Sequence, residues 1–200
     1  MSPPLSNKKR EEKALLEKCR KGDLEAFDRL IRENQDLVYN VAFKLLGNED
    51  DAFDLSQEVF LTFFRKIKSF RAESALSTWL YRVTVNRARN FRKTKHKKRE
   101  SRTASIDQPV PGYEEENLTL QLENHNPGPD KISADRQSLD ILREKIRELP
   151  HEFAEVIVLR FNEHMSYDEI ADVLECSLGT VKSRINRARK LLREKMEPFL

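Results

Sequence analysis

The stretch from Phe70 to Arg99 constrains the fold more than any other part of the chain. It joins a short polar loop, expected at residues 71–77, to a helix with two contrasting edges. At about 100° per residue, the apolar side chains of this helix form one stripe. The stripe consists of Leu76, Trp79, Leu80, Val83 and Phe91. A second stripe, at spacings of four, three and four residues, carries Arg82, Asn86, Arg89 and Lys93. We therefore expect one edge in a core and the other against an anion.

The cationic edge is strongly asymmetric. Residues 87–99 hold eight Lys or Arg and no Asp or Glu. A basic run of this kind, taken alone, is often only a solvated helix face. Here, however, no carboxylates within the run pair with the charges, and amide and aromatic side chains that can contact bases are interleaved with them. The pattern therefore favours a nucleic acid as the partner.

The composition indicates an all-α protein. Charged residues make up 36% of the 200 residues, only five are glycine, and long stretches consist of helix formers. Cys19 and Cys176 match no zinc or redox spacing, and we find neither a signal peptide nor an apolar run long enough to span a membrane. We expect a soluble, cytoplasmic protein with no direct membrane insertion.

Two small helical domains are expected, at residues 11–99 and 133–200, after a flexible tail at residues 1–10. Between the domains, residues 100–132 contain seven acids, two bases and four prolines. This composition predicts a flexible acidic linker, which as a coil would span about 30 Å. The two domains could then act on separated sites. An acidic strand could also occupy a positive channel meant for nucleic acid.

In the first domain, helices are expected at residues 11–21, after a cap at Asp23, and from Asp36 to a C-terminal glycine at Gly47. The helix after Asp23 is expected to carry Leu24, Phe27, Leu30 and Ile31 on its inward side.

A further helix, expected at residues 50–67, has two distinct edges. Its inward face is expected to comprise Val59, Phe60, Phe63, Phe64 and Ile67. Another edge, at spacings i, i+3, i+4 and i+7, comprises Asp54, Gln57, Glu58 and Leu61. Such an edge is typical of a solvated helix face. Its mixture of acid, amide and leucine also fits a partner protein that presents arginines.

The second domain ends in a helix-turn-helix pattern. A capping-box sequence at residues 166–169 starts a short helix, and Ser177 is placed to cap the last long helix. Seven bases between residues 182 and 195 face only one acid, Glu194. The apolar stripe of the last helix is Val181, Ile185, Ala188 and Leu192. In such a unit the second helix enters the major groove of duplex DNA, and flanking cations hold phosphates.

Nothing in the sequence has the spacing of an active site. The histidines at positions 96, 125, 151 and 164 do not cluster with carboxylates or cysteines, and no glycine-rich phosphate loop is present. We assign no catalytic residue, no metal ligand and no cofactor, and predict that the protein is not an enzyme.

Three sequence blocks occur in the order found in a known family. They are Asp54-Leu-Ser-Gln57-Glu58-Val-Phe60; Phe70-Arg-Ala-Glu-Ser74 with Ser77-Thr-Trp79-Leu-Tyr81-Arg82 and Val85-Asn86; and Ser166-Tyr-Asp-Glu169-Ile-Ala171 with Gly179-Thr-Val181-Lys-Ser183-Arg184. With these blocks the chain resembles bacterial sigma factors of the extracytoplasmic-function (ECF) group, which contain only regions 2 and 4. The resemblance covers nearly the whole chain and implies a region 2 helical bundle at residues 11–99 and a region 4 helix-turn-helix domain at residues 133–200.

The resemblance implies an alternative sigma factor that binds core RNA polymerase, recognises −10 and −35 promoter elements and promotes strand opening without ATP. Its implied partners are the β′ clamp helices and β flap of the polymerase, promoter DNA, and an anti-sigma factor. A membrane-bound anti-sigma factor would hold the protein at the membrane.

Site residues follow from the same resemblance. The polymerase-binding residues would be Asp54, Gln57, Glu58 and Leu61. The −10 residues would be Lys66, Phe70, Arg71, Ser74, Trp79, Arg82, Asn86, Arg89, Asn90 and Lys93, with one flipped base in a pocket formed by Lys66, Phe70 and Asn86. The −35 residues would be Thr180, Lys182, Ser183, Arg184, Asn186, Arg187 and Lys190.

Two other hypotheses are weighed against this one. A free-standing helix-turn-helix regulator would explain residues 133–200 but leaves the Trp79 helix and the acidic edge without a role. A helical adaptor that binds acidic proteins leaves the loop before that helix unexplained.

Overall fold

The computed structural model of the chain describes residues 5–70, 75–103 and 139–199, with side chains described for residues 10–70, 75–95 and 139–199. Within these ranges every regular element is helical, which confirms the all-α prediction. The predicted −10 residues Arg71 and Ser74, and the predicted linker beyond residue 103, lie outside the described residues.

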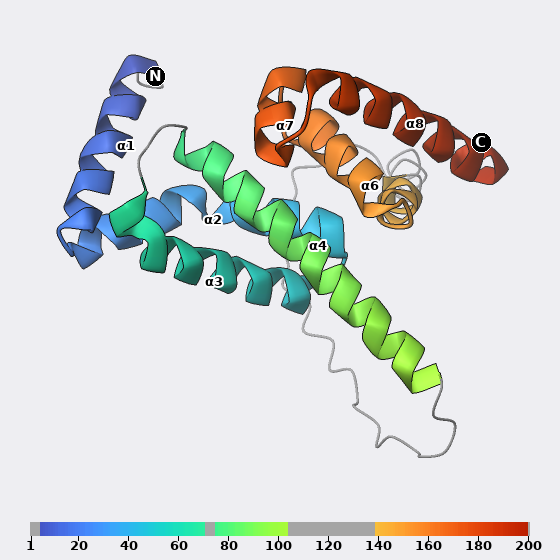
Figure 1. Cartoon of the computed structure of the whole chain (residues 1–200), viewed down its shortest axis with the longest axis horizontal. Coiled ribbons are helices and arrows are strands. Elements are labelled where there is room, and N and C mark those ends of the chain that lie inside the picture. Colours follow the sequence, from blue (N-terminus) through green and yellow to red (C-terminus); the bar gives the residue numbers. More distant parts are fainter. Residues whose placement is uncertain (1–4, 71–74, 104–138, 200) are drawn as a thin grey trace, which may run out of the picture.

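The elements form two helical units (Figure 1). The first contains α1 (Leu5–Arg20), α2 (Leu24–Leu46), α3 (Glu49–Lys66), the 3-10 turn η1 (Ile67–Ser69) and α4 (Leu76–Thr103). The second contains a helical segment at residues 139–147, α6 (His151–Ile157), the π-helical turn η2 (Val158–Asn162), α7 (Tyr167–Leu174), α8 (Leu178–Met196) and the 3-10 turn η3 (Glu197–Phe199).

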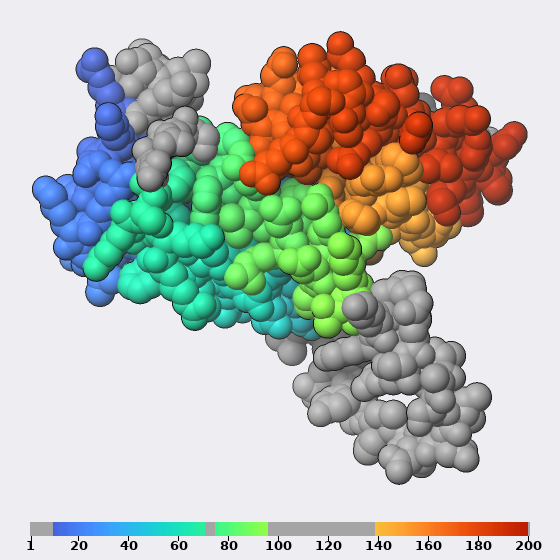
Figure 2. Space-filling model, viewed as in Figure 1, coloured from blue at the N-terminus to red at the C-terminus, as the bar shows by residue number. Residues whose placement is uncertain are grey.

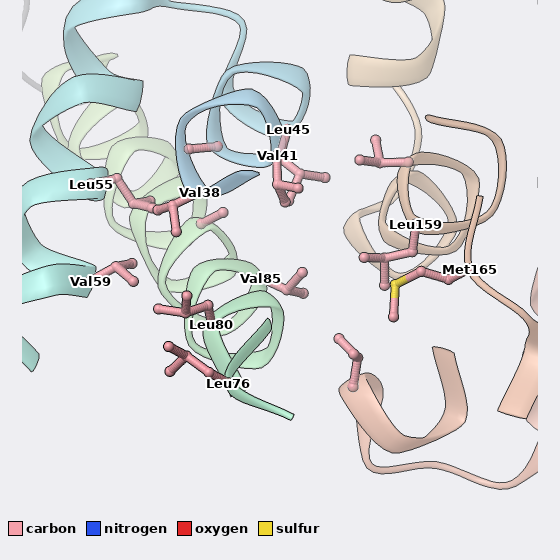
Figure 3. Close-up of a cluster of buried hydrophobic side chains, with 14 of the residues drawn as sticks. Val38, Val41, Leu45, Leu55, Val59, Leu76, Leu80, Val85, Leu159 and Met165 are labelled. Carbon is pink, nitrogen blue, oxygen red and sulfur yellow. The ribbon is translucent and has the colours of Figure 1, made fainter. Parts of the chain in front are cut away.

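Helix α2 is the centre of the first unit, where it packs against α1, α3 and α4. The core between these helices is apolar because their inward positions carry aliphatic and aromatic side chains at helical spacing. Figure 3 shows part of it, with Val38, Val41 and Leu45 from α2, Leu55 and Val59 from α3, and Leu76 and Leu80 from α4.

The predicted helix caps of this unit are confirmed. The Asp23 carboxylate accepts a hydrogen bond from the Ala26 amide at 3.0 Å, and Gly47 ends α2 with a φ of 75°. The left-handed conformation at Gly47 suits glycine, which has no Cβ to clash. Helix α3 then starts at once, with the Asn48 side chain accepting from the Asp51 amide at 2.8 Å.

Four predicted boundaries were wrong. Helix α1 begins at Leu5, so residues 5–10 are helical and do not belong to a tail. Helix α2 continues without a break from Leu24 to Leu46, because residues 32–36 contain no glycine or proline and the Asn34 amide donates back to the Leu30 carbonyl at 2.8 Å. Helix α4 starts before the predicted end of the loop and runs to Thr103, past the predicted start of the linker.

Two predicted inward side chains are exposed. Phe64 lies on the outer side of α3 with 49% of its surface exposed, and Leu24 at the start of α2 is also exposed. Conversely, Thr84, Val85 and Ala88 of α4 are buried although they lie outside the predicted apolar stripe. For Val85 the reason is that the second unit packs against this side of α4.

The helix-turn-helix of the second unit is formed by α7 and α8. In the predicted capping box, the Ser166 hydroxyl accepts from the Glu169 amide at 3.2 Å, and the Glu169 carboxylate accepts from the Ser166 amide at 2.7 Å. Glu175, with a φ of 52°, forms the turn, and Ser177 caps α8 by accepting from the Thr180 amide at 3.1 Å. Of the predicted apolar stripe on α8, Val181, Ile185 and Ala188 are buried and Leu192 is partly buried.

The two units pack against each other through α4 and α7 and through α2 and η2. In Figure 3, Val41, Leu45 and Val85 of the first unit face Leu159 and Met165 of the second. None of the described helices is long and apolar enough to cross a lipid bilayer.

Candidate nucleic-acid interface

A groove between α3 and α4 gathers amide, hydroxyl and cationic side chains. Its polar lining is Glu58, Thr62, Lys66, Asn86, Arg87, Asn90 and Thr94, and its apolar lining is Leu55, Val83 and Phe91. Asn86 and Asn90 are exposed and lie one helical turn apart on α4. Because an amide offers both donors and an acceptor, this pair can bond to the edge of an unpaired base.

The structure brings together some of the predicted −10 residues. Lys66, Asn86 and Asn90 line the groove, and Lys93 is exposed on α4. Phe70 does not line the groove but is buried, with its ring 5.9 Å from Trp79 and 6.2 Å from Phe63 between centroids. The groove therefore brings together Lys66 and Asn86 of the predicted pocket, whereas Phe70 belongs to an aromatic cluster with Phe63 and Trp79.

Arg87 is a groove residue that the sequence did not single out. It forms an ion pair with Glu58 and donates to the Thr62 hydroxyl at 2.6 Å. These bonds join α4 to α3 and fix the width of the groove. Helical spacing on α4 does not predict these bonds, because Glu58 lies 29 residues away from Arg87 in the chain.

The predicted polymerase-binding residues Asp54, Gln57, Glu58 and Leu61 are all exposed on α3. Beside them, an apolar groove is lined by Phe27, Ile31, Gln57, Phe60, Leu61 and Phe64. The edge is therefore polar along one side and apolar along the other. This arrangement is typical of protein interfaces, which combine an apolar centre with a polar rim.

Two predicted −10 residues, Arg82 and Arg89, face the second unit instead of the groove. Arg89 donates to both carboxylate oxygens of Glu155, at 3.0 and 2.7 Å, and these hydrogen bonds raise the pKa of the Arg89 guanidinium. Arg82 forms an ion pair with Glu175 at 3.1 Å and donates to the Asp172 carbonyl at 2.7 Å. The predicted cationic stripe is thus divided between two environments.

Most of the predicted −35 residues lie together on the outward side of α8, which forms an open ridge at one edge of the molecule in Figure 2. The exposed members are Lys182, Ser183, Asn186, Arg187 and Lys190. Thr180 and Arg184 are partly buried: the Thr180 hydroxyl lies 2.9 Å from that of Ser177, and Arg184 pairs with Glu152 at 3.4 Å. The ridge thus combines cations, which suit phosphates, with hydroxyl and amide groups, which suit base edges.

In the described part of the chain, no group of three or more His, Cys, Asp or Glu could hold a metal ion. Cys19 and Cys176 are both free, and burial raises the pKa of the Cys19 thiol.

Comparison with known proteins gives two family matches. Sigma-70 region 2 matches residues 30–98, and Sigma-70, region 4 matches residues 139–192. The ECF RNA polymerase sigma-E factor of Haemophilus influenzae is 33% identical over 197 residues, covering 94% of this chain and 97% of that protein. The ECF sigma-E factor of Escherichia coli K12 is 31% identical over 189 residues, with coverages of 94% and 96%.

Among solved structures, the chain is similar to the sigma factor RpoE of Bartonella quintana, which was co-crystallised with the anti-sigma factor NepR. The TM-score is 0.61 at 22% identity, covering 86% of this chain and 96% of that one. The groove between α3 and α4 falls within the first matched region, and most of α8 falls within the second.

Proposed function

The chain belongs to the extracytoplasmic-function (ECF) sigma factors of bacterial RNA polymerase, and we propose that its α3–α4 groove receives the unpaired strand of the −10 promoter element while α8 reads the −35 element as duplex. It is an alternative sigma factor for transcription initiation, with core RNA polymerase and promoter DNA as partners. The observation that carries the proposed division is that exposed amides beside Lys66 line a groove, whereas the cations of α8 form a ridge.

In the groove, strand opening is driven by binding energy. Extruding a base from the stack costs a few kcal/mol. Stacking on an aromatic ring contributes about 1–3 kcal/mol per base, and hydrogen bonds from Asn86 and Asn90 add to it. Phe91 lines the groove and offers an aromatic surface, while Lys66 and Lys93 attract the backbone. Phe70 and Trp79 pack against each other at the start of α4 and support this helix. No ATP, cofactor or catalytic group takes part.

On α8, the exposed ridge fits the major groove. Lys182, Ser183, Asn186 and Arg187 lie in the N-terminal half of the helix, which is the part that reaches base edges in helix-turn-helix proteins. Lys190, one turn further, is placed for a phosphate. Arg184 is held by Glu152, so we assign it a positioning or phosphate contact rather than a free base contact.

The exposed edge of α3 is the proposed docking surface for the β′ clamp helices, with the β flap meeting the second unit. Asp54 and Glu58 supply negative charge, and Leu61 with Phe64 supplies apolar area. Such a surface suits a helical partner that presents arginines beside aliphatic side chains. An anti-sigma factor is a further proposed partner, because the similar RpoE was crystallised with one. If that partner is membrane-bound, it holds this chain at the membrane.

A gel-shift assay with and without core polymerase tests the proposal. The sigma factor is expected to bind promoter fragments weakly alone and to form heparin-resistant open complexes with core enzyme. Tight operator binding without core would instead support a free-standing helix-turn-helix regulator.

Replacing Arg187 with alanine is expected to weaken −35-dependent transcription. It should also reduce the slope of log K against log salt by up to about 0.9 for each lost phosphate contact. Titration of holoenzyme onto a −35-containing fragment at several salt concentrations measures the slope. Arg143→Ala is the matched control, since it removes the same charge from an exposed site on another helix of the same unit. A slope and transcript yield equal to the control would show that Arg187 is only solvated.

A further inference from the structure

The side of α4 that faces away from the groove is occupied by carboxylates of the second unit. We propose that these carboxylates, namely Glu155, Glu163 and Glu175, act as an intramolecular anion that competes with promoter DNA for Arg82 and Arg89 in the free protein. This inference rests on the proposed function and on the sequence-based prediction that both arginines contact the −10 element. We call the three side chains the acidic face.

Glu155 provides the most deeply buried contact of the acidic face. Only 2% of its surface is exposed, and Arg89 donates to both of its oxygens. A buried carboxylate is costly unless it is paired with a cation in good geometry. We call the structure with the two units packed together the closed arrangement. In it, Arg89 is the cation that pairs with Glu155. Arg89 also donates to the Asn86 side-chain oxygen at 3.4 Å, so the acidic face reaches one of the groove amides through it.

Glu163 connects the acidic face to two helices of the first unit. Its two oxygens accept from the Lys44 ammonium on α2 and from the Tyr81 hydroxyl on α4, each at 2.9 Å. Burial, and to a smaller extent the negative charge of Glu163, raises the pKa of the Tyr81 hydroxyl far above its ordinary value. The hydroxyl therefore remains a neutral donor. Glu175 adds the ion pair with Arg82.

Further bonds close the same interface through backbone carbonyls. Arg92 donates to the carbonyls of Arg147 and Leu149, at 2.7 and 3.3 Å, and Arg147 donates to the Gly47 carbonyl at 3.1 Å. Gly47 is suited to this approach, since a Cβ there would overlap the Arg147 guanidinium.

The interface is incompletely satisfied. Among the described residues, Arg82 Nε and Arg92 Nη1 are buried without a hydrogen-bond partner. Burial also lowers the pKa of the Arg92 guanidinium, which marks it as poorly compensated. Unpaired buried donors are costly, so a DNA phosphate that accepts from the Arg82 guanidinium is expected to displace the Glu175 carboxylate. The two units are therefore expected to stay packed together in the free protein. They are expected to separate when polymerase and DNA are present.

A zero-length cross-link reports directly on the closed arrangement. A carbodiimide joins an amine to a carboxylate only when they touch, as Lys44 and Glu163 do. In the wild-type free protein we expect a Lys44–Glu163 amide by mass spectrometry, and we expect its yield to fall when core polymerase is added.

The variant Glu155→Gln/Glu175→Gln leaves this reporter intact and neutralises two members of the acidic face. It is expected to lose most of the cross-link and to bind a single-stranded −10 oligonucleotide about fivefold or more tightly than wild type. The control Glu144→Gln/Glu194→Gln changes the net charge equally at exposed sites outside the acidic face, and should match wild type in cross-link yield and gain less affinity. If circular dichroism shows that the variant is unfolded, Glu175→Gln alone, at an exposed site, tests the same direction.

Absence of the cross-link in the free wild-type protein would overturn the proposal. So would a loss of the cross-link with no gain in oligonucleotide affinity over the control. Failure of the proposed function itself is distinguishable, because it would appear as an absence of promoter opening by wild-type protein with core polymerase, whatever the cross-link yield.

Discussion

Replacing Phe63 with alanine is expected to lower the free energy of unfolding by about 3–5 kcal/mol, the range for deleting a buried phenylalanine ring. Phe63 is 1% exposed. Its ring centroid lies 5.5 Å from that of Phe27, 5.6 Å from Trp79 and 6.2 Å from Phe70. Removing the ring leaves a cavity where α2, α3 and the start of α4 meet. Urea unfolding followed by circular dichroism measures the loss.

The neighbouring residue supplies the control. Phe64→Ala removes the same atoms from a side chain that is 49% exposed, so it is expected to cost about 1 kcal/mol or less. Equal losses for the two variants would contradict the described orientation of α3. The pair also tests whether Phe63 supports the −10 surface, since Phe63→Ala should loosen Phe70 and Trp79 while Phe64→Ala should not.

Replacing Asn86 with alanine is expected to reduce promoter opening by about 10- to 100-fold, because a bidentate amide–base contact is worth about 1–3 kcal/mol and each 1.4 kcal/mol is tenfold. Asn86 is exposed in the α3–α4 groove, so its side-chain amide is accessible to an unpaired base. Permanganate reactivity of thymines around the start site measures the open fraction in the presence of core polymerase.

Asn40→Ala is the matched control, since Asn40 is an exposed asparagine on α2 that does not line this groove. Duplex binding through α8 should be unaffected by either change. Permanganate reactivity of the Asn86 variant equal to that of the Asn40 variant would refute the assignment of the groove to the unpaired strand.

Local chemistry made much of the fold predictable. The caps at Asp23, Gly47, Ser166 and Ser177 depend on bonds within four residues, and all form as expected. Helical periodicity likewise placed Leu80 and Val181 in the core, because residues at i, i+3 and i+4 share a face. The exposed residues of the α3 edge and the α8 ridge follow from the same rule.

Contacts between distant segments were not predictable in this way. Periodicity gives the direction of a helix face but not how much of the helix circumference is covered. Phe64 was therefore predicted to be buried although it is exposed, and Val85 was not predicted to be buried although it is. Arg89 was expected to meet an anion, and it does, but the anion is Glu155, 66 residues away, in a second unit whose position no local pattern specifies. The role of Arg87 in the groove was not predicted for the same reason, because its partners Glu58 and Thr62 lie on another helix.

The most direct measurement of the central claim is in vitro transcription by core RNA polymerase on genomic fragments, with permanganate mapping of the same complexes. The account predicts transcripts from defined start sites and reactive thymines near them only when both core enzyme and this protein are present. Failure of the purified protein to associate with core polymerase, or complexes that form but never separate the strands at any start site, would contradict it.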